Sequence, residues 1–115
     1  MIELSHFSTH FRYKTNRLQM EGVPVERLAK KFGTPLYIYS ASEMTDAYRR
    51  LKEGLRSIPN LIAFAVKANS NIHVLKQLVR LGAGLDLVSG GELFRAKKAQ
   101  CPPDRILFSG IGKSE

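Results

Sequence analysis

The chain has little of what an exported or membrane-spanning protein needs. Its 115 residues contain one cysteine, Cys101, so no internal disulfide can form. The longest uninterrupted hydrophobic run covers residues 61–66, far short of the ~20 residues that a membrane-spanning helix requires. The N-terminal stretch MIELSHFSTHFRYK has no hydrophobic core of signal-peptide length. These absences favour a protein of the reducing cytoplasm that is not bound to a membrane.

Acidic residues are also few. The sequence has 10 Asp and Glu against 18 Lys and Arg, which gives a formal net charge of +8. Such an excess can indicate a nucleic-acid partner. Here the basic residues are spread over several expected helices, with no interleaved aromatic residues and no helix-turn-helix or zinc-finger spacing. We therefore expect solvated helix surfaces and no nucleic-acid partner.

Metal-ligand spacing is missing as well. His6, His10 and His73 do not combine with cysteines or acids in a metal-binding pattern. His6 and His10 are four residues apart, which brings two side chains together only on a helix, and FSTHFRYK is not typical of one. We expect no metal site.

The first third of the chain predicts a short helix, a β segment and a longer helix. VPVERLAKKFG has its apolar residues on one helical face, a proline that suits the first turn and a glycine that suits the C-terminal end. Residues 34–40, TPLYIYS, have the aromatic and β-branched composition of a strand. Ser40 and Glu43 have the spacing of a capping box at the start of the next helix.

The rest of the chain predicts strands that alternate with helices through short links, which is typical of parallel βαβ units. Expected strands are residues 61–67, 84–89 and 105–109, and expected helices are residues 72–81, capped by Ser70 or Asn71, and 92–99, opened by a Ser89–Glu92 capping box. Three parallel strands form a small sheet with open edges, which proteins normally avoid. An eight-stranded barrel needs ~250 residues, so we expect the segment to be the opening part of something larger.

Lys67 stands at the end of the hydrophobic stretch LIAFAVK, where a charged residue is unexpected. Side chains at the carboxyl ends of parallel strands carry the chemistry of such folds, and Asp86 lies in the next expected strand. A lysine that is partly desolvated by Phe64, Val66 and the wall of a barrel favours its neutral amine, as a Schiff-base nucleophile requires. A structural ion pair, or a lysine that reaches out to solvent, explains the same pattern equally well.

Three blocks of this sequence resemble the fold-type III pyridoxal-phosphate decarboxylases, and among them the diaminopimelate decarboxylases. The blocks are FAVKANSN, GAGLDLVSGGEL and ILFSGIGKS, and GTPLYIYS resembles the family's entry into its barrel. The resemblance runs from about Phe11 to the end, and the run around Lys67 is highly specific.

The resemblance implies an α/β chain that forms the N-terminal portion of a (β/α)8 TIM barrel of the alanine racemase-like type. Residues 1–39 would pair with a C-terminal β-domain, and residues 40–115 would form the first βα units. Lys67 would bind pyridoxal 5'-phosphate covalently as the catalytic lysine, and Asp86 would line the same cofactor site. The implied reaction converts meso-diaminopimelate to L-lysine in a homodimeric enzyme. The chain alone, which lacks the family's phosphate loop and catalytic cysteine, is expected to be inactive.

Several alternatives remain open at the level of sequence. Another fold-type III decarboxylase, acting on ornithine, arginine or carboxynorspermidine, shares the fold and the lysine. Alanine racemases usually have a tyrosine where this chain has Ser70. A pyridoxal-phosphate-binding remnant or a basic interaction protein without catalysis is also compatible. The end of a nucleotide-binding P-loop is matched by Gly112, Lys113 and Ser114, but the first glycine of that motif is replaced by Leu107.

Overall fold

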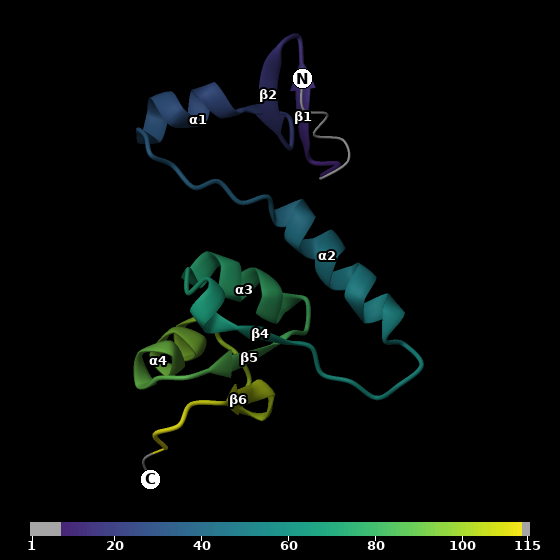
Figure 1. Ribbon diagram of the computed structural model, residues 1–115, viewed down its shortest axis with the longest axis vertical. Helices are drawn as coiled ribbons and strands as arrows, with labels where there is room; N and C mark the ends of the chain where they lie inside the picture. The colour runs from purple at the N-terminus through teal and green to yellow at the C-terminus, as the bar shows by residue number, and fades with distance from the viewer. Residues whose placement is uncertain (1–7, 114–115) are drawn as a thin grey trace. The chain divides into compact units, whose positions relative to one another are not determined.

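The computed structural model describes residues 8–113. His6, Ser114 and the outer ends of the expected segments 1–39 and 40–115 lie outside the described residues. The chain divides into two compact units, one ending at Asp46 and the other beginning at Ala47 (Figure 1). Within residues 8–113 there is no helix with the length and apolar character needed to cross a membrane.

The N-terminal unit contains a small antiparallel sheet that the sequence analysis did not predict. Strand β1 (Phe11–Lys14) pairs with β2 (Arg17–Met20), and β2 pairs with the short β3 (Val23–Pro24). Thr15 and Asn16 form the connecting turn with φ angles of 50° and 59°, as a two-residue hairpin turn requires. Strands of four residues offer too short an alternation to stand out in a sequence.

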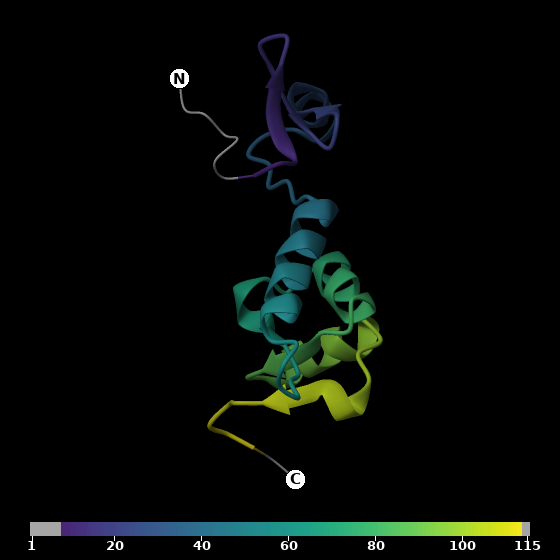
Figure 2. The same cartoon turned by 90° about the vertical axis from the view of Figure 1, so that its right-hand side faces the viewer.

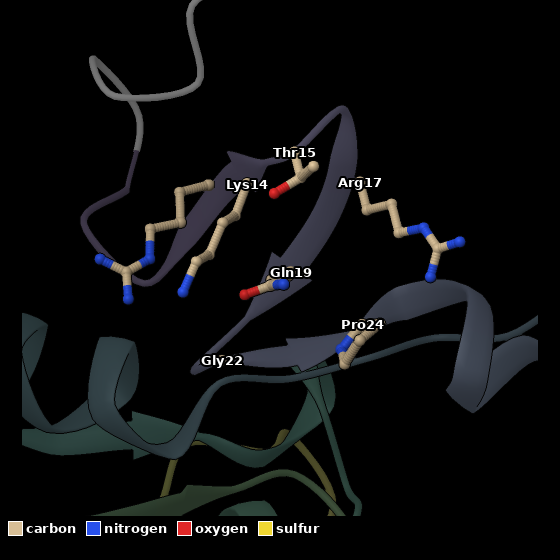
Figure 3. Close-up of a pocket in the computed structure, with 7 residues that line it drawn as sticks. Lys14, Thr15, Arg17, Gln19, Gly22 and Pro24 are labelled. Carbon is tan, nitrogen blue, oxygen red and sulfur yellow. The ribbon is translucent and has the colours of Figure 1, made fainter.

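One face of this sheet is strongly basic. Arg12 and Lys14 of β1 and Arg17 and Gln19 of β2 alternate with apolar neighbours and line an open hollow of about 560 Å³ (Figure 3). Lys14 and Arg17 are direct cross-strand partners. Like charges that face each other across a ladder are unfavourable, so this face gains no stability from its charges.

Helix α1 (Val25–Phe32) confirms the first predicted helix. It begins directly after Pro24, and Gly33 ends it at φ 82°, a conformation that glycine adopts most readily. The predicted β segment at residues 34–40 is wrong, because these residues pair with no strand of the described chain. Pro35 cannot donate a ladder hydrogen bond, and the side chain of Tyr37 is 85% exposed.

Helix α2 (Ala41–Gly54) begins at the predicted cap, but the capping box is only half formed. The hydroxyl of Ser40 accepts a hydrogen bond from the backbone N–H of Glu43 at 2.9 Å. The Glu43 carboxylate does not reach back to Ser40; it accepts instead from the hydroxyl of Ser8. The second partner of the cap is Glu21, whose carboxylate accepts from the Ser40 hydroxyl at 2.5 Å and from the Ser42 backbone N–H at 2.9 Å.

The C-terminal unit confirms the predicted alternation of strands and helices (Figures 1 and 2). Its sheet has the order β4-β5-β6, and both strand pairs are parallel. The elements in chain order are β4 (Ala63–Ala65), a 3-10 turn at Val66–Ala68, α3 (Ile72–Arg80), β5 (Gly84–Leu87), α4 (Gly90–Lys98), a second 3-10 turn at Pro103–Arg105 and β6 (Ile106–Phe108).

The two predicted helix starts of this unit are present with small differences. Asn71, and not Ser70, caps α3, because its side chain accepts from the backbone N–H of His73 at 2.9 Å. Ser89 caps α4 by accepting from Glu92 N–H at 3.2 Å. Glu92 in turn accepts from the backbone N–H of Val88 at 2.7 Å, one residue before the position of the ideal box.

The core of the C-terminal unit lies between the sheet and its two helices. Leu85 and Leu87 of β5 are fully buried together with Leu75 of α3 and Ala96 of α4. Because side chains alternate along a strand, Gly84 and Asp86 of β5 lie on the other face of the sheet. The sheet therefore has a helix-covered face and an open face.

Candidate cofactor site

The open face of the sheet carries a row of three residues near the carboxyl ends of its strands. Ala65 of β4 is the register partner of Asp86 in β5, and Asp86 is the partner of Leu107 in β6. Neighbouring strands lie about 4.8 Å apart, and the alanine leaves the central carboxylate uncrowded. Leu107 is 45% exposed. Asp86 therefore stands in the middle of this face with a small residue on one side.

Lys67 follows this row. The sequence predicted that Lys67 is the last residue of its strand, and this prediction is wrong. Strand β4 ends at Ala65, and Lys67 is the central residue of the 3-10 turn Val66–Ala68. Phe64 and Val66 do not desolvate it, because Val66 is buried in the helix-covered core and Phe64 packs against that core. The Lys67 side chain is exposed. The three described strands therefore do not bury the amine. The expected burial also requires the barrel wall, which is not among the described residues, so it stays a prediction.

The segment that carries Lys67 is held at both ends. On its N-terminal side Val66 is fully buried, and its carbonyl accepts from the backbone N–H of Asn69 at 3.1 Å. On its C-terminal side the Asn69 side chain accepts from the backbone N–H of Asn71 at 3.0 Å. Arg95 of α4 donates from Nη1 to the carbonyl oxygen of Ser70 at 3.1 Å. Lys67 thus extends from a fixed backbone.

Asp86 has an unsatisfied oxygen. Its Oδ1 is buried and has no hydrogen-bond partner among the described residues, although the residue as a whole is half-buried. A buried acceptor without a donor is costly, so a donor that reaches this oxygen would be stabilised there. An ammonium group on a neighbouring strand end, or a ligand with an N–H or O–H group, meets that requirement.

A hollow of about 380 Å³ lies at the same end of the sheet. It is lined by residues that follow β5, begin α4, and end or follow β6, namely Val88, Ser89, Gly90, Leu93, Phe108, Gly112 and Lys113. The backbone at Gly90 has open space where a side chain would project. Because Lys67 follows β4, all three strands contribute to this edge of the sheet, the usual location of ligand sites in parallel α/β folds.

The remaining candidate groups are not arranged for chemistry. Leu107 lies within β6, so the loop from 109 onward cannot begin where a P-loop would. Among residues 8–113, no three His, Cys, Asp or Glu side chains are placed to hold a metal ion. Cys101 is buried, and burial raises the pKa of its thiol, which makes it an unreactive core residue.

Sequence reasoning missed two contributors to this part of the fold. The contact between Arg95 and Ser70 spans 25 positions and has no local spacing signal. Gly84 is required because a Cβ atom there would come within 2.5 Å of the Arg105 carbonyl oxygen. In the sequence, this close approach of the two backbones is indicated only by the presence of a glycine at the start of β5.

The comparisons with known proteins point to one family. A family described as "Pyridoxal-dependent decarboxylase, pyridoxal binding domain" matches residues 26–115. A diaminopimelate decarboxylase of Pseudomonas fluorescens is 49% identical over 104 residues, which are 90% of this chain and 25% of that protein. The chain thus spans about a quarter of the length of the curated relatives that it matches.

Solved structures agree. A protein of Aquifex aeolicus is 43% identical, with a TM-score of 0.90 over 98% of this chain and 28% of its own. A diaminopimelate decarboxylase from M. jannaschii, solved with L-lysine, is 36% identical with a TM-score of 0.86 over 92% of this chain and 26% of its own. These matches confirm the predicted α/β class, and the family's description agrees with the expected cofactor. The chain belongs to the pyridoxal-dependent decarboxylase family, in the part that forms the pyridoxal binding domain.

Proposed function

We propose that the protein of which these residues are part decarboxylates meso-diaminopimelate to L-lysine with pyridoxal phosphate, and that Lys67 is the residue that binds the cofactor. The observation that carries this proposal is the position of Lys67. It projects from a fixed 3-10 turn at the carboxyl end of β4, beside the strand that holds the unsatisfied carboxylate of Asp86. The substrate is proposed from the relatives, because two of them are named diaminopimelate decarboxylase and one was solved with L-lysine.

The residues present fit the cofactor. Pyridoxal phosphate, when bound, supplies a ring that accepts the electron pair left behind as carbon dioxide departs. The exposed amine of Lys67 is accessible for a covalent bond to an aldehyde carbon. The carboxylate of Asp86 would hold the Lys67 ammonium before the cofactor arrives, which would give its buried oxygen a donor. After carbon dioxide has left, Lys67 would, as its ammonium, assist the return of a proton to the substrate carbon, or would bind the cofactor again.

The assembly around this site is also proposed. Residues 1–39, of which 1–7 lie outside the described residues, would pack with a C-terminal β-domain, and residues 40–115 would form the first βα units of the barrel. Among residues 8–113 no strand pairs with the outer edge of β1, and this edge and the 57% exposed Tyr13 support a further partner for the N-terminal sheet. We further propose a homodimer in the cytoplasm, where the lone, buried Cys101 stays reduced.

The test of the function is covalent trapping at Lys67. The protein expressed from its complete reading frame should, after borohydride reduction with pyridoxal phosphate, carry a pyridoxyl group on Lys67, detected by peptide mass spectrometry. Lys67→Ala should remove the visible absorbance of the bound cofactor and reduce decarboxylation by at least about a thousandfold, because the covalent and proton-transfer roles are lost together.

Lys76→Ala is the matched control, since it removes a lysine from α3 in the same unit. It should retain both the absorbance and the activity. A pyridoxyl group on Lys76, Lys113 or any lysine other than Lys67 would overturn the assignment. Release of carbon dioxide from ornithine or arginine, and not from diaminopimelate, would overturn the substrate alone.

A further inference from the structure

We infer that Arg95 is a positioning residue for Lys67, an inference that rests on the proposed function. Arg95 lies in α4, the helix that follows β5, whereas Lys67 lies in the turn that follows β4. The guanidinium Nη1 of Arg95 donates to the carbonyl oxygen of Ser70 at 3.1 Å. A contact thus joins the helix of one βα unit to the cofactor-lysine turn of the preceding unit.

The contact acts on the part of the turn that the core does not fix. Val66 anchors the start of the turn because it is fully buried, but Lys67 and Ala68 are exposed, and Asn69 and Ser70 are only half-buried. The hydrogen bonds of the Asn69 and Asn71 side chains are local, within two residues. These bonds stabilise the turn itself but do not connect it to the following βα unit. The hydrogen bond from Arg95 makes that connection.

The same helix forms one wall of the hollow at the strand ends. Ser89, Gly90 and Leu93, at the start of α4 and in its first turn, line this hollow. Arg95 lies one turn further along and reaches back across to Ser70. The distance between the Lys67 amine and this wall is therefore set partly by one hydrogen bond. Displacements of about 1 Å are enough to impair a site that must present a nucleophile to an aldehyde.

Arginine suits this position better than lysine does. Its planar guanidinium holds several donors in a fixed geometry, and a hydrogen bond from a charged donor to a carbonyl is stronger than one from a neutral donor. A lysine could place one donor near Ser70 but with a flexible stem. The expected order of function is therefore arginine first, lysine second and an uncharged side chain last.

The experiment compares Arg95→Gln, Arg95→Lys and Lys97→Gln in the protein expressed from its complete reading frame. Lys97→Gln is the matched control, because Lys97 is an exposed cation on the same helix. Amide hydrogen exchange of residues 67–71 is measured without cofactor. The rate of covalent attachment of pyridoxal phosphate to Lys67 and the thermal unfolding temperature are measured in parallel.

For Arg95→Gln we expect exchange in 67–71 to rise and the attachment rate to fall by about two- to threefold, because the contact is exposed and water screens the guanidinium charge. Arg95→Lys should recover part of both losses. The unfolding temperature should change no more than in Lys97→Gln. If Arg95→Gln matches Lys97→Gln in exchange and in attachment, while the wild type attaches cofactor normally, the inference is overturned.

Different results would overturn the role of Lys67 and the role of Arg95. If the wild type carries its pyridoxyl group on a lysine other than Lys67, the proposed function fails. The exchange measurement without cofactor would then still decide whether Arg95 orders residues 67–71, and equal exchange in all variants would overturn that link too.

Discussion

Asp86 is the residue whose removal separates stability from function most clearly. Its Oδ1 is buried without a donor, which costs stability, while the proposed site gives that oxygen a use. In the cofactor-free protein the proposed contact with the Lys67 ammonium supplies that donor, so Asp86→Ala should leave the fold intact and change the free energy of unfolding by no more than about 1 kcal/mol. It should also weaken retention of pyridoxal phosphate, measured as cofactor lost on dialysis.

Leu107→Ala is the control for Asp86, because Leu107 is its register partner on the same face. This change should leave cofactor retention nearly unchanged. If Asp86→Ala retained cofactor and turned over substrate as the wild type does, Asp86 would have no role in the site.

Glu21 provides a test of pH dependence. Hydrogen bonds from the Ser40 hydroxyl and from the Ser42 backbone lower the pKa of its carboxyl below the usual value of 4.5. A group whose pKa is lower in the folded state stabilises the fold above its unfolded-state pKa, and that contribution is lost as the pH falls through the folded-state pKa. Glu21→Gln should therefore destabilise the start of α2 at pH 7, and the difference from the wild type should shrink below about pH 4.5.

The expected loss at pH 7 is under about 1 kcal/mol, because the exposed carboxylate is screened by water. Urea unfolding followed by circular dichroism at pH 7 and at pH 3.5 measures it. Glu26→Gln is the charge-matched control, because it removes an equal charge from the first turn of α1 and leaves the contacts of Glu21 with Ser40 and Ser42 in place. If the free energies of unfolding of Glu21→Gln and the wild type differed equally at pH 7 and at pH 3.5, the Glu21 carboxylate would not stabilise the start of α2.

At the scale of elements, the sequence predicted helices and strands correctly where the hydrophobic pattern and the local capping residues indicate the same element. The strand around Phe64, the alternation of β5 and the caps at Asn71 and Ser89 predicted the C-terminal unit, because its strands and helices are defined by hydrophobic period and short polar signals. The same reasoning predicted that the segments carrying Lys67 and Asp86 are neighbours, and β4 does pair with β5, although Lys67 lies in the 3-10 turn that follows β4.

Reasoning from sequence was weaker where structure depends on partners. The segment with Tyr37 and Tyr39 has strand composition but finds no partner among the described residues, so composition alone misled. The β1–β2 hairpin was missed because its turn, Thr15 and Asn16, lacks the usual glycine. The exposure of Lys67 depends on which surfaces surround it, and no local pattern records that.

At the scale of the whole molecule, the parallel sheet has β4 and β6 at its edges, and neither pairs with a further strand in the part of the chain that the structure describes. Exposed edges with apolar side chains promote association, and the open face adds Leu107, which is 45% exposed. We therefore predict that the 115-residue chain, expressed alone, associates in solution and releases no measurable carbon dioxide from diaminopimelate with added pyridoxal phosphate. Light scattering and a carbon dioxide assay measure these properties.

Leu107→Lys tests the cause, because a charge on an edge strand opposes edge pairing. This variant should shift the scattering mass toward the monomer. A compact wild-type monomer with measurable turnover would contradict both the association and the requirement for further segments.

The two faces of the parallel sheet also bear on how such a protein can change over generations. Leu85 and Leu87 hold the core, whereas Asp86, one position away, faces the proposed site. Substitutions at Ala65, Asp86 or Leu107 therefore alter what the open face can bind with little effect on the packing of α3 and α4. Selection can explore new substrates on one side of a strand while the other side preserves the fold, so relatives with different substrates can share the same core.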